Sequence, residues 1–177
     1  MARELEIRFL DVDIGALTKR LETLGATKVG TWFQERFVFQ FPNNKEKGQR
    51  WIRLRTNGEK STIAYKHIHV NKIDGTEEIE FEVGDFHTAV QFLERCGFIK
   101  EGPQQNKRTR YMLDGVEIDI DTWPNCPTWV EIEGKTEAEI KETCTKLELD
   151  FKKGTTLGVL DVLVGYGYDR NQKVCKF

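Results

Sequence analysis

The chain has 177 residues, with 27 Lys and Arg against 29 Asp and Glu, a formal net charge of −2 and a pI near 6.0. This length and a hydrophobic content of 38% predict one compact unit with a core and exclude a largely disordered chain. The balanced charge excludes the broad basic field of sequence-independent nucleic-acid binders, so we expect no nucleic-acid polymer as a partner.

Location is indicated by two further features. No apolar run approaches the roughly 20 residues that a membrane helix needs, and the opening residues Met1 to Glu4 carry no signal-peptide core. The four cysteines lie far apart without a Cys-x-x-Cys pair, which favours neither a zinc site nor a disulfide framework. We therefore expect a soluble, cytoplasmic protein with reduced thiols and no membrane partner.

Three segments have the apolar spacing of amphipathic helices, at residues 13–25, 86–96 and 136–147. Asp13 is a suitable N-cap for the first helix and Gly25 a suitable stop. Thr136 and Glu139 form a capping box at the start of the third. Each helix has a narrow apolar stripe and therefore needs a surface to cover.

The remaining segments alternate apolar and polar residues, as strands do. We expect eight strands, at about 3–10, 33–41, 49–57, 60–67, 76–84, 105–113, 115–122 and 128–134. Asn57-Gly58 and Asp114-Gly115 favour two-residue hairpin turns, because both central positions take positive φ. These turns predict two antiparallel hairpins.

Nearly every predicted strand is charged on one face and apolar on the other. An ordinary sheet with one face in water explains any single strand, but it gives no reason to sort whole strands into acidic and basic ones. Because three helices can cover the apolar faces, we predict an α+β fold: an eight-stranded antiparallel β-barrel, or tunnel, with a charged interior and an apolar exterior covered by helices.

A charged interior indicates a charged ligand, because crowded carboxylates raise one another's pKa and unpaired buried charges cost several kcal/mol. The acidic residues offer hard oxygen ligands for Mg²⁺ or Mn²⁺, namely Glu4, Glu6, Asp121, Glu131 and Glu133. The basic residues offer donors for phosphate oxygens, namely Arg8, Arg53, Arg55, Lys66, Arg108 and Arg110. This mixture favours a metal–phosphate ligand such as a nucleotide.

The pentapeptide Glu4-Leu5-Glu6-Ile7-Arg8 resembles the N-terminal Glu-x-Glu-x-Lys signature of the CYTH superfamily, the triphosphate tunnel metalloenzymes. Further motifs follow the family order over residues 3–134: Arg53-Leu54-Arg55, Lys66, the Glu78 and Glu80 strand before a helix, Lys107 to Tyr111, and Asp121 ahead of Glu131-Ile132-Glu133. Two positions depart from the pattern. Arg8 replaces the usual Lys, and Arg36 stands where many members carry Asp.

The resemblance implies a single CYTH-like domain over residues 1–177, with a barrel core at about 3–134 and a C-terminal helix and tail at 136–177. It implies catalytic roles for Glu4, Glu6, Arg8, Lys66, Glu131 and Glu133. It implies substrate binding by Arg8, Arg53, Arg55, Lys66, Arg108, Arg110, Glu78 and Glu80. Dimers are common in the family, so a homodimer is among the expected states.

Four functions are compatible with this resemblance. We favour a lyase acting on an adenine nucleotide by class IV adenylyl cyclase-like cyclisation, because residues 121–134 resemble a branch labelled cyclase-like. The first alternative is a lyase that splits the signal nucleotide S-adenosylmethionine-AMP by elimination, for which the metal is dispensable. The others are a metal-dependent triphosphatase for inorganic or thiamine triphosphate, and a non-catalytic module that binds a phosphate ligand.

Some residues stay outside this scheme. His67-Ile68-His69 has metal-like spacing on a strand, but the sequence suggests no third ligand, so we interpret the pair as having a strand-end or loop role. Trp129 shares parity with the charged face of its strand. The C-terminal residues 165–177 either cover an opening of the tunnel or hang free, and the pattern does not decide between these.

Overall fold

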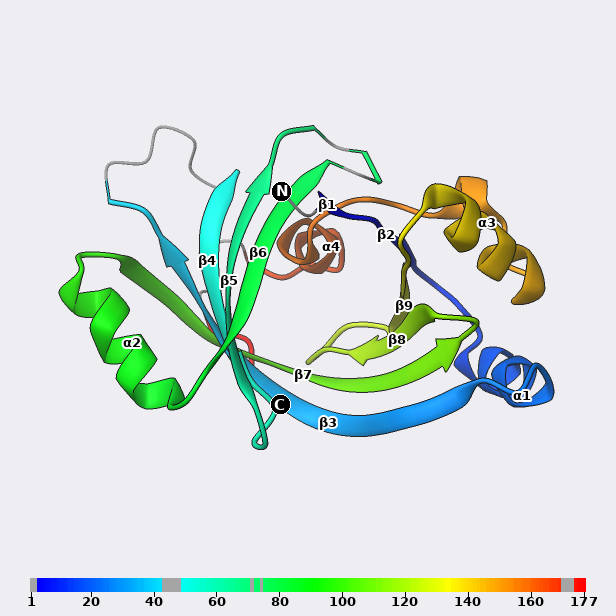
Figure 1. Cartoon of the computed structure of the whole chain (residues 1–177), viewed down its shortest axis with the longest axis horizontal. Coiled ribbons are helices and arrows are strands. Elements are labelled where there is room, and N and C mark those ends of the chain that lie inside the picture. Colours follow the sequence, from blue (N-terminus) through cyan, green and yellow to red (C-terminus); the bar gives the residue numbers. More distant parts are fainter. Residues whose placement is uncertain (1–2, 43–48, 71, 74, 170–173) are drawn as a thin grey trace.

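The computed structural model describes residues 3–42, 49–70, 72–73, 75–169 and 174–177 (Figure 1). Its strands are β1 (Arg3–Glu4), β2 (Glu6–Phe9), β3 (Thr27–Gln40), β4 (Arg50–Thr56), β5 (Ser61–Ile68), β6 (Thr76–Val83), β7 (Ile99–Leu113), β8 (Val116–Thr122) and β9 (Trp129–Glu133). Its helices are α1 (Ile14–Thr23), α2 (Phe86–Arg95), α3 (Glu137–Lys146) and α4 (Val159–Gly165), with a 3₁₀ turn at Phe151–Lys153.

The described strands form one antiparallel, strongly curled sheet in the order β1-β6-β5-β4-β3-β7-β8-β9-β2. Its two edge strands, β1 and β2, are consecutive in the chain and separated only by Leu5. Glu4 pairs with Thr76 of β6, and Glu6 pairs with Glu133 of β9, so one N-terminal stretch joins both edges. Counted as one strand, this stretch gives the eight predicted strands, and the predicted tunnel-like α+β fold is confirmed.

Two strands are longer than predicted. β3 begins at residue 27 and β7 at residue 99, whereas the alternation places their starts near 33 and 105. Their pairing carries register shifts between Lys28 and Gly30 and between Arg36 and Val38. A register shift breaks the period of two that reveals a strand in a sequence, which is why the pattern underestimates both strands.

The three predicted helices are confirmed, together with their caps. The Asp13 carboxylate accepts a hydrogen bond from the Ala16 amide at 3.0 Å, and the Thr136 hydroxyl accepts one from the Glu139 amide at 3.2 Å. The sequence does not predict α4, because this helix has only seven residues and its five apolar residues do not form a single stripe of helical period.

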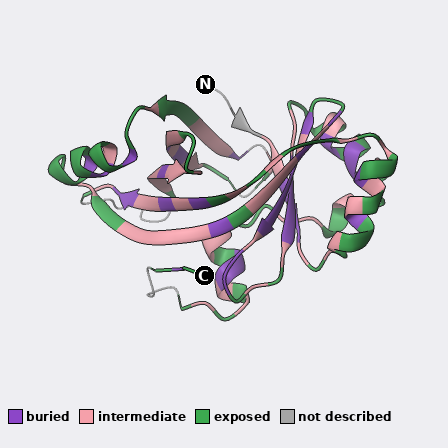
Figure 2. Cartoon of the chain, turned by 90° about the horizontal axis from the view of Figure 1, so that it is seen from below, coloured by how far each residue is buried: buried purple, intermediate pink, exposed green. Residues whose placement is uncertain are grey.

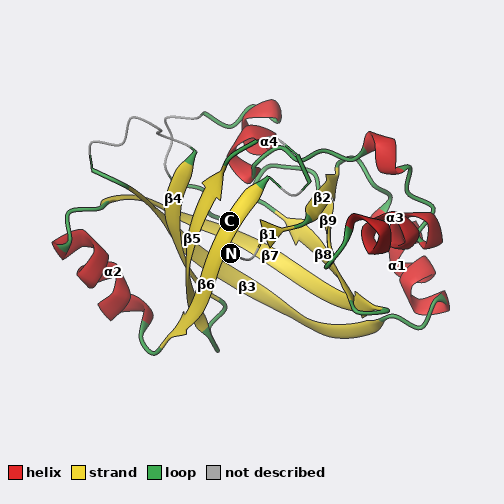
Figure 3. Ribbon diagram, turned by 45° about the horizontal axis from the view of Figure 1, so that its top comes forward, coloured by secondary structure: helices red, strands yellow, loops and turns green. Residues whose placement is uncertain are grey.

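Helices cover two parts of the outer face of the sheet. At one end α1 and α3 lie side by side (Figure 3), and Leu21 and Ile140 belong to the same core cluster as Ile132 of β9. At the other end α2 contributes Leu93 to a cluster with Leu54 of β4. Figure 2 shows buried residues both on the strands and on the helices that pack against them. The prediction of a covered apolar exterior is confirmed for these two regions.

The outer face of β6 departs from that prediction. Ile79 and Phe81 are 51% and 60% exposed, because the described helices lie over other strands. β6 nevertheless alternates acidic and apolar residues along its length, as the sequence predicts.

The C-terminal segment lies on the inner side of the curled sheet. α4 contributes Val162 and Leu163 to a cluster with Trp123, which follows β8, and with Trp129 of β9. Trp129 pairs in register with Asp121 and therefore has the parity of the charged face. Arg8 and Thr155 exchange backbone hydrogen bonds of 2.9 and 2.8 Å. The segment from Thr155 through α4 therefore covers part of the concave face, and it buries Trp129 completely.

We expect side chains on the helix-covered part of the outer face to contribute more to the free energy of unfolding than side chains on the uncovered part. Replacing Ile132, which is fully buried, by Ala should lower the free energy of unfolding by about 2–5 kcal/mol through lost contacts and a cavity. The same change at the half-exposed Ile79 should cost only about 1 kcal/mol or less, reflecting strand preference alone. Urea denaturation of both variants measures the difference, and equal losses would contradict this account of the outer face.

Candidate functional site

The charged residues of β8, β9 and β2 lie in rows across the concave face. In one row Glu117, Glu133 and Glu6 pair in register across the three strands. In the next row Asp119 and Arg8 flank Glu131 on either side. The alternation of strand residues thus places these charges together on the interior, as the sequence predicts.

Two arginines hold the Glu131 carboxylate. Arg8 Nε donates to Oε1 at 2.8 Å and Arg108 Nη2 donates to Oε2 at 2.7 Å. The indole of Trp129 adds a third donor to Oε1 at 3.3 Å. Arg8 also contacts Glu6 at 3.1 Å and donates to the backbone carbonyl of Leu157. Arg8 is therefore the link between the acidic row, Glu131 and the C-terminal segment.

Arg108 and Arg110 pair with the carboxylates of β8. Arg110 holds Asp119 with a fork of two hydrogen bonds, at 2.8 and 2.6 Å. Arg108 contacts both oxygens of the fully buried Asp121 and also reaches Asp119 at 2.6 Å. Planar guanidinium groups suit this two-point pairing with carboxylates. Asp119 is not among the site residues predicted from the sequence, although the alternation of β8 places it on the same face as Glu117 and Asp121.

The two central carboxylates differ in their acidity. Burial alone would raise the pKa of Glu131, but Arg8 and Arg108 outweigh this effect and hold it well below its usual value. Burial raises the pKa of Asp121, and the neighbouring Glu131 charge adds to the rise although Arg108 opposes it. As the pH falls, Asp121 is therefore the first of this pair to take up a proton.

A second charged cluster lies on β4, β5 and β6. Arg53 contacts Glu78 at 3.0 Å and Glu80 at 2.7 Å. Lys66 contacts Glu78 at 3.3 Å, and Arg55 contacts Glu80 at 3.6 Å. The structure thus brings the predicted phosphate-binding residues of these strands together with the two glutamates assigned to substrate binding.

Arg36 of β3 completes this cluster, although the sequence analysis notes it only as a departure from the family pattern. It pairs in register with Arg55, is 8% exposed, and lies over the Trp123 ring at 4.3 Å. Its Nε donates to Gln104 Oε1 at 3.1 Å, and among the described residues no carboxylate lies within ion-pair distance of it. Arg36 has the same strand parity as Gln34 and Gln40, and this parity places its side chain on the concave face of the sheet.

The arginines of this cluster lower one another's pKa. Burial, with the nearby Arg53 and Arg55, lowers the pKa of Arg36 to about 9. The charge of Arg53, followed by burial, lowers the pKa of Arg55 to about 10. A guanidinium in water is protonated far above these values, so both burial and the neighbouring arginines oppose the positive charges of this cluster. Such a cluster is suited to bind an anion with several negative oxygens.

The predicted metal ligands are only partly suited to a divalent cation. Glu6 and Glu133 lie opposite one another, and like charges in such pairs destabilise a sheet unless a cation lies near them. Glu117 extends this row, so the row offers the hard oxygens that Mg²⁺ and Mn²⁺ prefer. The carboxylates of this row are not unpaired, because Arg110 contacts Glu117 at 2.6 Å and Arg8 contacts Glu6 at 3.1 Å. Glu131 and Asp121 are held more closely, by Arg8 and Arg108, and would have to leave these arginines to bind a metal ion. The side chain of Glu4 lies outside the described residues.

The fold and this site define a tunnel-type protein whose concave face combines carboxylates with a cationic cluster. A sequence profile of the CYTH domain matches residues 2–162, and the chain belongs to that family. Among solved structures, PH1012 from Pyrococcus horikoshii OT3 is 26% identical, with a TM-score of 0.76 over 90% of this chain and 98% of that chain. No curated protein matches the chain.

Two more distant structures share the fold. A candidate adenylate cyclase from Vibrio parahaemolyticus is 13% identical, with a TM-score of 0.76 over 92% of this chain and 98% of that chain. A candidate adenylyl cyclase from Hippeastrum, HpAC1, with a dominant triphosphatase activity, is 16% identical, with a TM-score of 0.62 over 97% of this chain and all of that chain. Within the described part of the chain, every helix is too short or too polar to cross a membrane.

We expect Glu131→Gln to destabilise the protein, because it leaves Arg8 and Arg108 buried with less compensating charge. The loss should be about 3–5 kcal/mol at neutral pH. The depressed pKa of Glu131 stabilises the fold above the unfolded value of 4.5, and this stabilisation is lost as the pH falls. The difference between wild type and variant should therefore shrink below about pH 4.5 in denaturation curves.

Glu137→Gln is the matched control for this variant. Glu137 lies on α3 in a solvent-exposed pair with Lys141, and its loss should cost well under 1 kcal/mol at any pH. A gap between wild type and Glu131→Gln that stays constant down to acid pH would show that Glu131 is not held charged.

Proposed function

We propose that this chain is a tunnel enzyme that binds a phosphate-bearing adenine nucleotide on its concave face and acts on it as a lyase. The observation that carries the proposal is the largely buried guanidinium cluster of Arg36, Arg53 and Arg55, in which burial and neighbouring arginine charges lower the pKa values of Arg36 and Arg55. A triphosphate chain supplies several negative oxygens to such a cluster. Membership of the CYTH family supports the same ligand class.

In the proposed reaction a ribose hydroxyl oxygen bonds to the α-phosphorus, the bond to the bridging oxygen breaks, and pyrophosphate leaves with that electron pair. Arg53, Arg55 and Lys66 hold the phosphate oxygens and stabilise the charge that develops on the leaving group. A carboxylate of the Glu6, Glu133 and Glu117 row accepts the hydroxyl proton. A divalent cation held by this row, when bound, polarises the phosphoryl group.

A second candidate function is supported by the pairing of Arg8 with Glu131 and Arg108 with Asp121. Because arginines already balance these two carboxylates, this part of the site is charge-compensated without a metal. That arrangement favours a metal-independent elimination in the methionine moiety of S-adenosylmethionine-AMP, with a tunnel glutamate as the base. The two lyase reactions differ in substrate and in metal requirement.

We expect Arg36→Gln to weaken binding of inorganic tripolyphosphate by about 10–100-fold, the effect of losing one charged hydrogen-bond donor. In the wild type, affinity should decline as the pH rises through about 9, because Arg36 then loses its proton, and the variant should lack this component. Isothermal titration calorimetry between pH 7 and pH 10 measures both effects.

Arg95→Gln, which removes an exposed charge on α2, is the matched control and should bind as the wild type does. Equal affinity of the Arg36 variant and the wild type would remove this cluster from the ligand site.

The reaction itself is tested by product analysis. The protein is incubated with ATP, tripolyphosphate, thiamine triphosphate or S-adenosylmethionine-AMP, with and without Mg²⁺ or Mn²⁺, and the products are separated chromatographically. We expect cyclic AMP and pyrophosphate from ATP with metal, and a loss of at least about 100-fold in Glu133→Gln, which removes a charged oxygen from the acidic row.

Glu137→Gln should retain full activity. Release of orthophosphate from tripolyphosphate would identify a triphosphatase instead, and binding of these compounds without turnover would identify a non-catalytic module. Metal-independent cleavage of S-adenosylmethionine-AMP would select the second candidate.

A further inference from the structure

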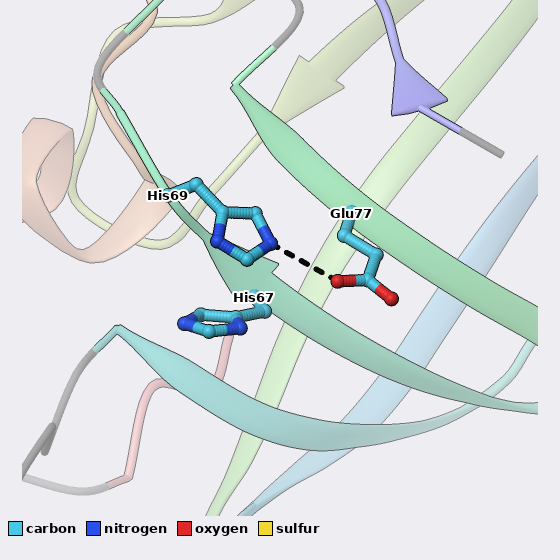
Figure 4. A group of neighbouring side chains, drawn as sticks. All are labelled: His67, His69 and Glu77. Atoms are coloured by element: carbon cyan, nitrogen blue, oxygen red, sulfur yellow. Dashed lines mark hydrogen bonds and ion pairs between the residues drawn. The ribbon is translucent and has the colours of Figure 1, made fainter. Parts of the chain in front are cut away.

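Two histidines and a glutamate meet on the outer face of the sheet, away from the tunnel (Figure 4). His67 is the last but one residue of β5, His69 comes directly after the end of this strand at Ile68, and Glu77 of β6 pairs in register with His67. Their neighbours Lys66 and Glu78 have the opposite parity and contact each other on the inner face. The group is therefore separated from the charged interior by the sheet itself.

The three side chains already lie close to the geometry of a shared ion. One ligand atom of each residue lies within 4.8 Å of the other two. His69 Nε2 and Glu77 Oε2 are 3.0 Å apart, and the two imidazole rings are centred 4.0 Å apart. Ligand atoms around a tetrahedral zinc ion, bonded at roughly 2.0–2.1 Å, lie about 3.3 Å from each other. Small side-chain rotations therefore suffice to bring all three onto one ion.

The donor set selects the type of cation. Two imidazole nitrogens and one carboxylate oxygen suit Zn²⁺, whereas Mg²⁺ and Ca²⁺ prefer oxygen ligands throughout. Three protein ligands leave the fourth tetrahedral position for water. The carboxylate also balances part of the charge of the ion.

The surroundings of His67 favour coordination through one nitrogen. Its Nδ1 lies 3.4 Å from the Tyr65 hydroxyl, and a partner at Nδ1 orients the ring and directs Nε2 toward a metal. Arg50, which pairs in register with His67 from β4, brings a positive charge to this face. Its guanidinium lies over the Phe41 ring at 4.9 Å.

We propose that His67, His69 and Glu77 form a Zn²⁺ site that is independent of the tunnel. The ion would tie the ends of β5 and β6 together across the hairpin. Arg3 of β1 pairs in register with Glu77, so the site lies where the N-terminal stretch joins this edge of the sheet. The site is structural: it stabilises the junction that completes the curled sheet and takes no part in the proposed reaction.

The test uses the full chain without an affinity tag, in a Cys96→Ser background, because Cys96 is an exposed thiol that would itself bind zinc. Zn²⁺ is titrated by calorimetry, and Co²⁺ is used as a visible-absorption probe of coordination. We expect one high-affinity Zn²⁺ site, a rise in melting temperature with Zn²⁺, and Co²⁺ bands of tetrahedral type. His69→Ala should weaken Zn²⁺ binding by at least about 100-fold, since it removes one of only three protein ligands.

The exposed third histidine of the chain provides the matched control: His87→Ala on α2 should bind Zn²⁺ and gain stability as the parent does. His69 is itself largely exposed, so His69→Ala should fold, and Glu77→Gln gives a second, independent loss of ligand. Zn²⁺ affinity unchanged in both variants, or abolished instead by Glu133→Gln in the tunnel, would overturn the proposal, as would the absence of a high-affinity site in the parent.

Discussion

Burial of charge on the concave side of the sheet is the constraint on which the rest of the structure depends. Arg8 and Glu131 are buried, Arg108 is mostly buried, and each is held by an oppositely charged partner within hydrogen-bond distance. An isolated buried charge would cost several kcal/mol, so these groups are tolerated only as a network. Since Arg8 also contacts the C-terminal segment, this network connects the first strand, the last strand and the segment that covers them.

The interior divides into two zones with different electrostatic character. On β2, β8 and β9 most carboxylates are balanced by arginines, and the pKa of Glu131 is depressed accordingly. On β3 and β4 the arginines outnumber their carboxylate partners, and the pKa values of Arg36 and Arg55 fall. A ligand with phosphates at one end and a cation or hydroxyl group at the other would complement both zones. This asymmetry, rather than any single catalytic residue, is the basis of the proposed function.

The two faces of the sheet have different roles: the inner face carries the proposed ligand site, and the outer face carries the contacts that stabilise the fold. The same alternation that sends Lys66 and Glu78 inward sends His67 and Glu77 outward, so adjacent residues serve a ligand tunnel and a proposed metal clamp. The helices cover the outer face of the strands near α1, α2 and α3, and they leave β6 partly exposed. The hairpin beyond β5 is therefore a place where a bound ion would replace the support that a helix gives elsewhere.

Much of the fold follows from local patterns in the sequence. The alternation of Glu6 with Ile7 and of Arg53 with Leu54 fixes which side chains share a face, because the period of a strand is two. The caps at Asp13 and Thr136 fix where helices begin, because a side-chain oxygen there satisfies a free amide. The charged interior, and the family it resembles, could be inferred from these residues alone.

Only the tertiary structure decided which charges meet. The register of β3 against β4 places Arg36 opposite Arg55, and the register of β5 against β6 places Glu77 opposite His67. Neither pairing is encoded in the spacing along one strand, since register depends on turns, bulges and packing of the whole sheet. For the same reason the sequence left open where the C-terminal residues lie: the contacts of α4 with Trp123 and Trp129 join segments far apart in the chain, and no local period records them.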